Sequence, residues 1–296
     1  MKHTTKIKVA GYLFIAPVVI GFILMVIVPA AFSVALSFRS WNGLENVFET
    51  RFIGLDNYRW LITDSQFHNA MRNTVLFTIG MVLGQSALGF ALALALNSVT
   101  RGLGILRSIF FLPSILSIIA MSLLWRNVMY TPTYGAFNII LRTLGLPGQP
   151  FLQSVDQALP SIILMTIWRF AGHYMILFIA GLKNISTDYY ESARIDGAHK
   201  IHEFWYITMP LIRPTLLLVL IMNAIGSFQV FGPVFMMTMG GPGRATESIV
   251  TLMFNTAFGF GRFSYAAAMS VVLFFIIMLI TLVQMRLMRK GGLQEY

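Results

Sequence analysis

The sequence carries little charge and no cysteine. Charged residues make up 11% of its 296 positions and hydrophobic residues 57%, whereas soluble domains carry about 25% charged residues. A chain so poor in charge cannot cover a surface that faces water, which indicates an integral membrane protein. The absence of cysteine excludes disulfides, thiol catalysis and cysteine metal ligands, and it leaves the redox compartment open.

Sequence motifs of enzymes are also missing. The sequence holds no GxxxxGK[ST], so it cannot form a P-loop, and it holds no HExxH. The stretch GGPGRA, Gly240–Ala245, lacks the Lys-Ser/Thr pair and predicts a turn. His199 and His202 could ligate a metal, but the remaining ligands would have to come from elsewhere in the chain. We therefore favour the interpretation that both are solvated histidines. We therefore expect no catalytic residue, no metal site and no cofactor on this chain.

The charges that are present lie mainly between apolar runs. All 11 acidic residues fall in loops or tails, so the apolar runs lack the paired carboxylates typical of a proton relay. Energy for uphill transport would then have to come from a partner. The net charge of +10 is not gathered into a stripe or a tail, which argues against a nucleic-acid partner.

Six apolar stretches are long enough to cross a membrane, which takes about 20 residues. They predict an all-α, polytopic membrane helix bundle of about six transmembrane helices embedded in a lipid bilayer. Lysine and arginine are commoner on the side of the membrane that holds the N-terminus. This bias indicates that this side is the cytoplasm, and an even number of spans returns the C-terminus to it. The stretches lie between Lys8 and Arg39, between Arg72 and Arg101, between Arg107 and Arg126, between Asp156 and Lys183, from Pro214 to Thr238, and between Arg262 and Arg286.

Residues 1–296 are expected to form a single membrane domain, since no linker, low-complexity tract or repeat interrupts them. The first apolar run exceeds the roughly 7–15 residues of a signal-peptide core and is interpreted as a retained span. Residues 246–262 contain an apolar run that is too short to span. We expect this run to lie against the outer face of the membrane.

Residues 188–214 form the most charged and most punctuated segment of the chain. Asp188 with Glu191 at the third following position predicts the start of a helix over about Tyr189–Asp196. Gly197 indicates a left-handed turn or a close backbone contact at its end. Pro210 fits the first turn of the following helix.

A second short helix is predicted over His199–Thr208. Helical spacing assigns its residues to two faces, an apolar one with Ile201, Phe204, Trp205 and Thr208 and a solvated one with Lys200, His202 and Glu203. Helices this short rarely persist alone in water, so something must pack on the apolar face. That face either folds back on the protein's own spans or docks on a cytoplasmic partner through its aromatic residues.

At these residues the sequence resembles a known family. Glu191-Ser-Ala-x-x-Asp196-Gly197-Ala198, followed by Phe204, Pro210 and Pro214, is similar to the EAA loop of ABC importer permeases. Ser192 departs from the pattern, which has alanine there. The stretch from Phe52, FIGLDNYRWLITDSQFHNAMRNTVLFT, and the C-terminal GGP…TESIVTLMFNTAFGFGRFSYAAAMSVVLF resemble the binding-protein-dependent sugar permeases of the maltose-transporter type. They resemble in particular the first permease of each pair.

The resemblance implies partners and a mechanism. Residues 188–214 would be the cytoplasmic EAA coupling loop, which docks on ATPase subunits and would explain the missing P-loop. The implied assembly contains a second permease subunit, two ATP-binding cassette subunits that hold ATP and Mg, and an extracytoplasmic solute-binding protein, in a bacterial or archaeal inner membrane. The residues implied in ATPase coupling are Glu191, Ala193, Asp196, Gly197, Ala198, Phe204, Trp205 and Pro210.

Polar residues inside the spans are candidates for the solute pathway. Arg169 is the only charge within a span, and an arginine at that depth should face a cavity or the bundle. Alternatively, Arg169 could have a structural role and pair with backbone carbonyls. Hydroxyl-rich sugars need hydrogen bonds and aromatic contact, but polar residues in spans also bond neighbouring helices. The candidates are Arg169, His173, Asn223, Ser227, Gln229 and Phe231, with Asn73, Gln85 and Asn97 as weaker ones.

Two rival functions remain open at this point. An ion-coupled secondary transporter would lose uptake with the ion gradient and would usually carry a membrane carboxylate. A non-transporting membrane scaffold would tolerate loss of Arg169, Asn223 and Ser227. The sequence favours a permease subunit of an ATP-driven importer that works by alternating access.

Overall fold

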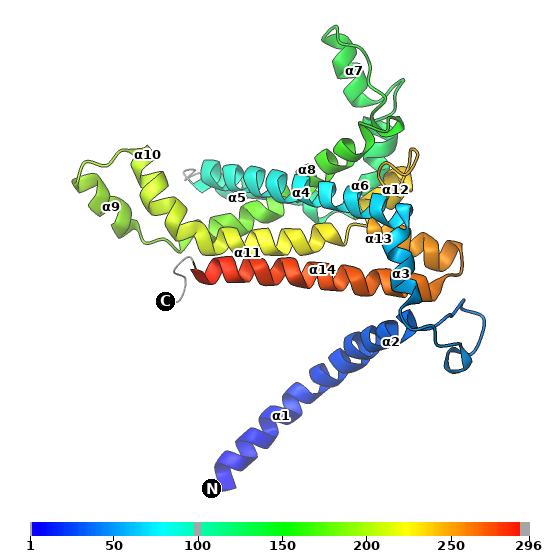
Figure 1. Ribbon diagram of the computed structural model, residues 1–296. Coiled ribbons are helices and arrows are strands. Elements are labelled where there is room, and N and C mark those ends of the chain that lie inside the picture. The colour runs from blue at the N-terminus through cyan, green and yellow to red at the C-terminus, as the bar shows by residue number, and fades with distance from the viewer. Residues whose placement is uncertain (1, 98–101, 291–296) are drawn as a thin grey trace. The chain divides into compact units, whose positions relative to one another are not determined.

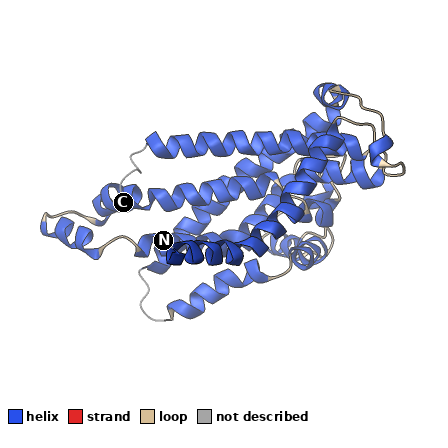
Figure 2. Cartoon of the chain, turned by 90° about the horizontal axis from the view of Figure 1, so that it is seen from below, coloured by secondary structure: helices blue, strands red, loops and turns tan. Residues whose placement is uncertain are grey.

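The computed structural model describes residues 2–97 and 102–290, with side chains for residues 12–47, 49–97 and 102–287. Within these ranges the chain is helical and holds no strand, only one bridge between Arg39 and Phe52 (Figure 2). The all-α prediction is confirmed. The elements are α1 Lys2–Phe22, η1 Ile23–Ile27, α2 Val28–Ser37, η2 Val47–Glu49, α3 Asp56–Thr63, α4 Ser65–Asn97, α5 Leu103–Ile115, α6 Ile118–Leu124, η3 Trp125–Met129, α7 Ala136–Thr143, η4 Phe151–Gln153, α8 Ala158–Lys183, α9 Thr187–Ile195, α10 Lys200–His202, η5 Glu203–Thr208, α11 Met209–Phe228, α12 Gly232–Thr238, α13 Ile249–Phe254, η6 Asn255–Gly259 and α14 Phe263–Lys290.

Among the described residues, 5 helices are long and apolar enough to cross a membrane, or up to 6 when a bent pair counts as one span. They correspond to the six apolar runs of the sequence. The uninterrupted ones are Tyr12–Ser37, Ser65–Asn97, Ala158–Lys183, Lys200–Phe228 and Phe263–Leu287. The apolar run within 246–262 forms a shorter helix, Ile249–Gly259, and Gly240–Ala245 lie in a turn, as predicted.

The third apolar run is broken, not continuous as the sequence suggested. α5 and the helix Ile118–Met129 meet at 91°, because Leu116 and Ser117 adopt extended backbone with ψ of 149° and 132°. Pro113 lies in the last turn of α5, where its missing N–H removes one hydrogen bond of the helix. The break therefore follows the turn of α5 that lacks one backbone hydrogen bond.

The fifth span also differs from its predicted limits. Its helix already begins at Lys200 and ends at Phe228, whereas the sequence suggested a run to Thr238. After Phe228 the chain leaves the helix and restarts as α12 with Pro233 in its first turn. A residue that precedes proline avoids the α region, so the Gly232-Pro233 pair marks this restart.

The chain divides into two compact units. The first contains the residues up to Asp64 together with Met253–Phe275. In it, Tyr265 Oη donates to Asp64 Oδ2 (2.6 Å) and the backbone N–H of Trp41 donates to Ser264 Oγ (2.8 Å). Asn57 is buried and donates to the carbonyl of Ser37 (2.8 Å). These bonds join segments that lie far apart in the sequence.

The second unit contains Ser65–Leu252 together with the segment that begins at Ile276. Within it α4, α5, α8 and α11 lie side by side (Figure 1), and the α4–α8 pair has the most extensive contact. Small residues permit this approach. A Cβ at Gly89 on α4 would lie 2.9 Å from the Cβ of Tyr174, and one at Gly172 on α8 would overlap the carbonyl of Phe110 on α5. Close packing at small residues is the usual way in which membrane helices associate.

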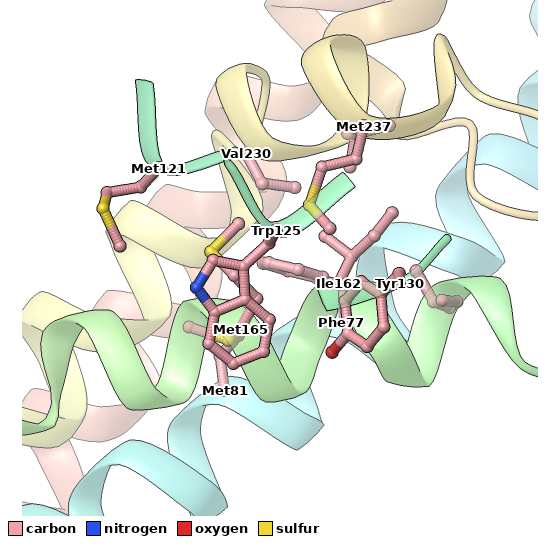
Figure 3. Close-up of a cluster of buried hydrophobic side chains, with 11 residues drawn as sticks. Phe77, Met81, Met121, Trp125, Tyr130, Ile162, Met165, Val230 and Met237 are labelled. Carbon is pink, nitrogen blue, oxygen red and sulfur yellow. The ribbon is translucent and has the colours of Figure 1, made fainter. Parts of the chain in front are cut away.

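A cluster of buried side chains lies within the second unit (Figure 3). We call it the buried cluster, and Tyr130 anchors it by donating its hydroxyl to the carbonyl of Ser161 (2.9 Å). The ring of Trp125 packs against that of Tyr130 at 5.5 Å between centroids. The members of the cluster are Phe77, Met81, Met121, Trp125, Tyr130, Leu159, Ile162, Met165, Val230, Val234 and Met237.

The contact at Gly172 gives a first prediction. Replacing Gly172 with alanine should force α5 and α8 apart, because the new Cβ meets backbone atoms of Phe110 and Phe111 that cannot rotate away. We expect a fall of several degrees in the melting temperature of the detergent-purified protein, since overpacking costs about 1–3 kcal/mol. Gly104→Ala on α5 is the matched control, because a Cβ there meets nothing within 4 Å. Equal melting temperatures for the two variants would contradict this packing.

Candidate functional site

The charged segment between the fourth and fifth spans folds as two connected helical pieces. α9 begins two residues earlier than predicted, at Thr187, because Ser186 is its N-cap and accepts a hydrogen bond from the backbone N–H of Asp188 (3.3 Å). The helix ends at Ile195. Figure 1 shows α9 and α10 at one end of the second unit, with α7 and α12 at the opposite end.

Gly197 closes α9 in the left-handed conformation, with φ of +83°. The backbone N–H of Gly197 donates to the carbonyl of Arg194 and that of Ala198 donates to the carbonyl of Ala193. This pair of bonds is the Schellman arrangement that ends many helices. Of the two alternatives, the left-handed turn is confirmed, and a Cβ at Gly197 would meet nothing within 4 Å in this chain.

The second piece is not the helix with one apolar face that the sequence suggested. α10, η5 and α11 run on as one helix, and η5 is a π-helix directly before Pro210. The wider π turn shifts side chains away from their expected faces. Glu203, assigned to the solvated face, is buried, whereas Ile201 and Trp205 are 72% and 60% exposed.

Arg194 and Glu203 join the two pieces. Arg194 Nε donates to Glu203 Oε1 (2.7 Å) and Arg194 Nη2 to Glu203 Oε2 (3.4 Å), which makes a two-pronged ion pair. The hydrogen bond to Glu203 raises the pKa of Arg194 above its ordinary value, so the guanidinium stays charged. Tyr190 and Thr208 share a second bond between hydroxyls (3.0 Å). Residues 187–208 therefore form one connected element.

This element is attached to the bundle by aromatic rings. Phe204 lies 6.2 Å from Phe90 of α4, and Phe90 lies 5.1 Å from Phe178 of α8, between ring centroids. Of the residues implied in coupling, Ala193, Ala198 and Phe204 are half-buried, while Glu191, Asp196, Gly197, Trp205 and Pro210 are exposed. Large apolar side chains that remain exposed here are Tyr189, Ile195, Ile201, Trp205 and Tyr206. The element thus presents an apolar surface that no described residue covers.

A cavity of about 610 Å³ lies within the second unit, between α4, α8, α11 and the α5–α6 break. We call it the central cavity. Five of the six pathway candidates of the sequence line it, namely Arg169, Asn223, Ser227, Gln229 and Phe231. His173 does not, since it is half-buried with its ring against Tyr174 at 5.4 Å between centroids. Gln85, a weaker candidate, lines the cavity too, as do Thr166 and Tyr174, which sequence reasoning missed.

Arg169 holds the broken span. Its Nη2 donates to the carbonyls of Ser114 (3.3 Å) and Leu116 at the C-terminal end of α5. Those carbonyls lose their helical partners at the break, and the end of a helix also carries partial negative charge that favours a cation. Arg169 thus contacts backbone carbonyls, which is one of the two roles that the sequence left open for it.

Three other polar side chains of the central cavity bond within the bundle. Asn223 Nδ2 donates to the carbonyl of Met81 on α4 (3.2 Å), and Ser227 Oγ donates to Asn223 Oδ1 (3.0 Å). Gln85 Nε2 donates to the carbonyl of Thr166 (3.1 Å). Asn73 instead donates to the carbonyls of Arg244 (3.0 Å) and Glu247 (3.2 Å), so it holds the Gly240–Ala245 turn and not a solute path.

A membrane helix bundle with an internal cavity, a broken span beside it and a folded element between two spans has the architecture of a transport permease. The chain belongs to the family described as binding-protein-dependent transport system inner membrane component, whose model matches residues 67–290. The chain is thus a membrane component of a transporter.

Curated relatives agree over nearly the whole chain. The probable ABC transporter permease protein YesP of Bacillus subtilis is 35% identical over 96% of this chain and 92% of its own length. The trehalose/maltose permease MalF of Thermococcus litoralis is 32% identical over 97% of both chains, and the sn-glycerol-3-phosphate permease UgpA of Agrobacterium fabrum is 31% identical over 96% of both. The resemblance to ABC importer permeases is confirmed.

A chain of a bacterial alginate ABC transporter, solved in complex with its pentasaccharide-bound periplasmic protein, has the same fold. Its TM-score is 0.86 at 23% identity, over 100% of this chain and 99% of that chain. A second structure, described as a bacterial ABC transporter that imports alginate, gives a TM-score of 0.84 at 24% identity. At such identities the likeness establishes the fold alone.

Proposed function

We propose that this chain is the permease subunit of an ATP-driven importer for a sugar, an oligosaccharide or a related solute. Family membership carries the proposal. The solute class is supported by relatives named for multiple sugars, for trehalose and maltose, and for starch degradation products. The central cavity fits this class, since it combines amide and hydroxyl groups with the rings of Phe170, Tyr174 and Phe231.

Residues 187–208 are the element that would meet the ATPase subunits. Several of its large apolar side chains are exposed, aromatic ones among them, and such residues are enriched in protein docking surfaces. Ion pairing of Arg194 with Glu203 would let the element move as one body, and Phe204 would pass that motion to α4. ATP and Mg would be held by the two partner ATPases, whose closure would drive alternating access around the central cavity.

This assembly orients the chain. If residues 187–208 are on the cytoplasmic side, four spans precede this element and two follow it. Both termini would therefore face the cytoplasm. The opposite end of the second unit would face away from the cytoplasm and receive the solute-binding protein. The segment 246–262 would then lie at that outer face.

The proposal is tested by what accompanies the chain. Tagged at its C-terminus and extracted in mild detergent from its own membrane, it should co-purify with a second polytopic chain and with a P-loop ATPase at twice the copy number. Mass spectrometry of the intact complex gives the stoichiometry. Recovery of the chain alone, or of a homodimer without an ATPase, together with uptake that collapses with the ion gradient, would favour a secondary transporter instead.

A further inference from the structure

A second cavity, of about 600 Å³, lies at the end of the second unit that carries α7 and α12. We call it the mouth cavity. It is built where η3 ends, around the loop that follows, and at the end of α12. The side chains that bear on the argument are Arg126, Asn127, Tyr130, Tyr134, Gln153 and Met237.

The mouth cavity holds several polar side chains that are exposed and make no hydrogen bond within the described part of the chain. No hydrogen bond is found for the side chains of Asn127, Tyr134 or Gln153 within the described ranges, and all three residues are exposed. An amide group both donates and accepts, and a phenol does the same. Sugar hydroxyls need such paired donors and acceptors, and the exposed ring of Tyr134 offers an apolar face for a pyranose.

The charge of the mouth cavity also fits a carbohydrate. Arg126 is its one charged side chain among the described residues, and Arg126 Nη1 already donates to the carbonyl of Met236 (3.2 Å). No carboxylate lines the cavity, so it offers no site for a metal or an amine. The volume suits a ligand of the size of a mono- or disaccharide, for which sites of roughly 300–1,000 Å³ are usual.

The mouth cavity and the central cavity lie in series. Tyr130 and Met237 of the buried cluster line the mouth cavity, while Phe77, Met81 and Val230 of the same cluster line the central one. Figure 3 shows Trp125 and Ile162 among these residues. Side chains of the buried cluster thus line both cavities, and its methionines repack readily because they are flexible.

We propose that the mouth cavity is a carbohydrate-binding subsite that holds the solute before it passes the buried cluster into the central cavity. This inference rests on the proposed function, because it takes the α7–α12 end as the outer side. Asn127 and Gln153 hydrogen-bond the hydroxyls, and Tyr134 covers a ring face.

The absence of native cysteine allows a direct test. Asn127→Cys and Gln153→Cys are each made in the complete importer, which is reconstituted in proteoliposomes without its solute-binding protein. The rate of modification by a membrane-impermeant maleimide is measured with and without maltose, trehalose or digalacturonate. We expect at least one of these sugars to slow modification at both positions by about tenfold. Thr143→Cys, on exposed α7 outside the cavity, should show no protection.

Each outcome is decisive. If the importer takes up one of these sugars with ATP and its binding protein, yet none protects either position, the subsite is wrong and the proposed function stands. If the sugar-free binding protein alone protects both positions, the mouth cavity is a protein docking surface and the inference is overturned. If ATP drives uptake of a related solute but of no carbohydrate, this inference is overturned while the importer assignment stands. If ATP drives no uptake at all, the proposed function falls and this inference falls with it.

Discussion

Replacing Gly197 with aspartate is expected to stop solute uptake while the chain still inserts and assembles in the membrane. The new side chain would project from a left-handed turn into space that no described atom of this chain occupies. The strain of a non-glycine residue there is only about 1–2 kcal/mol, too little to unfold the bundle. A loss of uptake of at least about tenfold would therefore support the docking of a partner that we propose for residues 187–208.

Two further substitutions separate conformation from contact at this position. Asparagine tolerates the left-handed region better than alanine, but its side chain is larger. If Gly197 serves only the turn, Gly197→Asn should retain more uptake than Gly197→Ala. If a partner approaches closely, Gly197→Ala should retain more, and ATP hydrolysis should continue without uptake in Gly197→Asn and Gly197→Asp. Normal uptake by Gly197→Asp would refute the coupling role.

Reversing either charge of the Arg194–Glu203 pair should reduce uptake about tenfold or more. Glu203→Arg places a cation in a buried position against Arg194, and Arg194→Glu leaves the Glu203 carboxylate without its partner. The cost falls on position 203, which is buried, and not on position 194, since the Arg194 side chain is 61% exposed. A buried charge that lacks its partner is costly. The double variant Arg194→Glu/Glu203→Arg restores the attraction and should recover uptake in part. Full recovery is not expected, since Glu191 and Lys200 favour the native arrangement of charges.

Arg213→Glu is the control for this cycle. It makes the same change of charge at an exposed position of α11, so it should leave uptake near the wild-type level. The measurement is ATP hydrolysed per solute molecule imported in proteoliposomes. A coupling element predicts that each single reversal raises this ratio and that the double variant lowers it again. A double variant no better than the single ones would show that the ion pair does not position the element.

The sequence predicted the spans because charge itself marks their ends. Lys183, for example, is both the charge that ends the fourth apolar run and the last residue of α8. The left-handed turn at Gly197 was predictable for the same kind of reason, since the signal is local.

The features that were missed depend on contacts or on helix type. The π-helix over Glu203–Thr208 has no signature in a pattern that assumes 3.6 residues per turn, so Glu203 was assigned to the wrong face and its bond to Arg194 was not foreseen. The break at Leu116–Ser117 is stabilised by Arg169, which lies far along the chain. A sequence shows the lone arginine but not the carbonyls that it contacts.

The central cavity could be predicted in part. Four of its residues are polar groups, which are rare in apolar spans, and Phe231 is an aromatic residue near them. His173 was a candidate on helical spacing alone. Helical spacing places His173 one turn from Arg169 on α8. Other helices pack against several sides of α8, however, so residues one turn apart can contact different helices.

The broken span has a consequence for how the protein is made. α5 has 13 residues, which reach about 20 Å at 1.5 Å per residue, short of the roughly 30 Å of hydrocarbon. Neither half of the pair can therefore settle as an ordinary membrane anchor when it leaves the ribosome. Its exposed carbonyls at Ser114 and Leu116 stay uncompensated until α8 has been synthesised and brings Arg169 to them. We therefore expect stable membrane integration of the third hydrophobic segment to wait until the fourth has been synthesised.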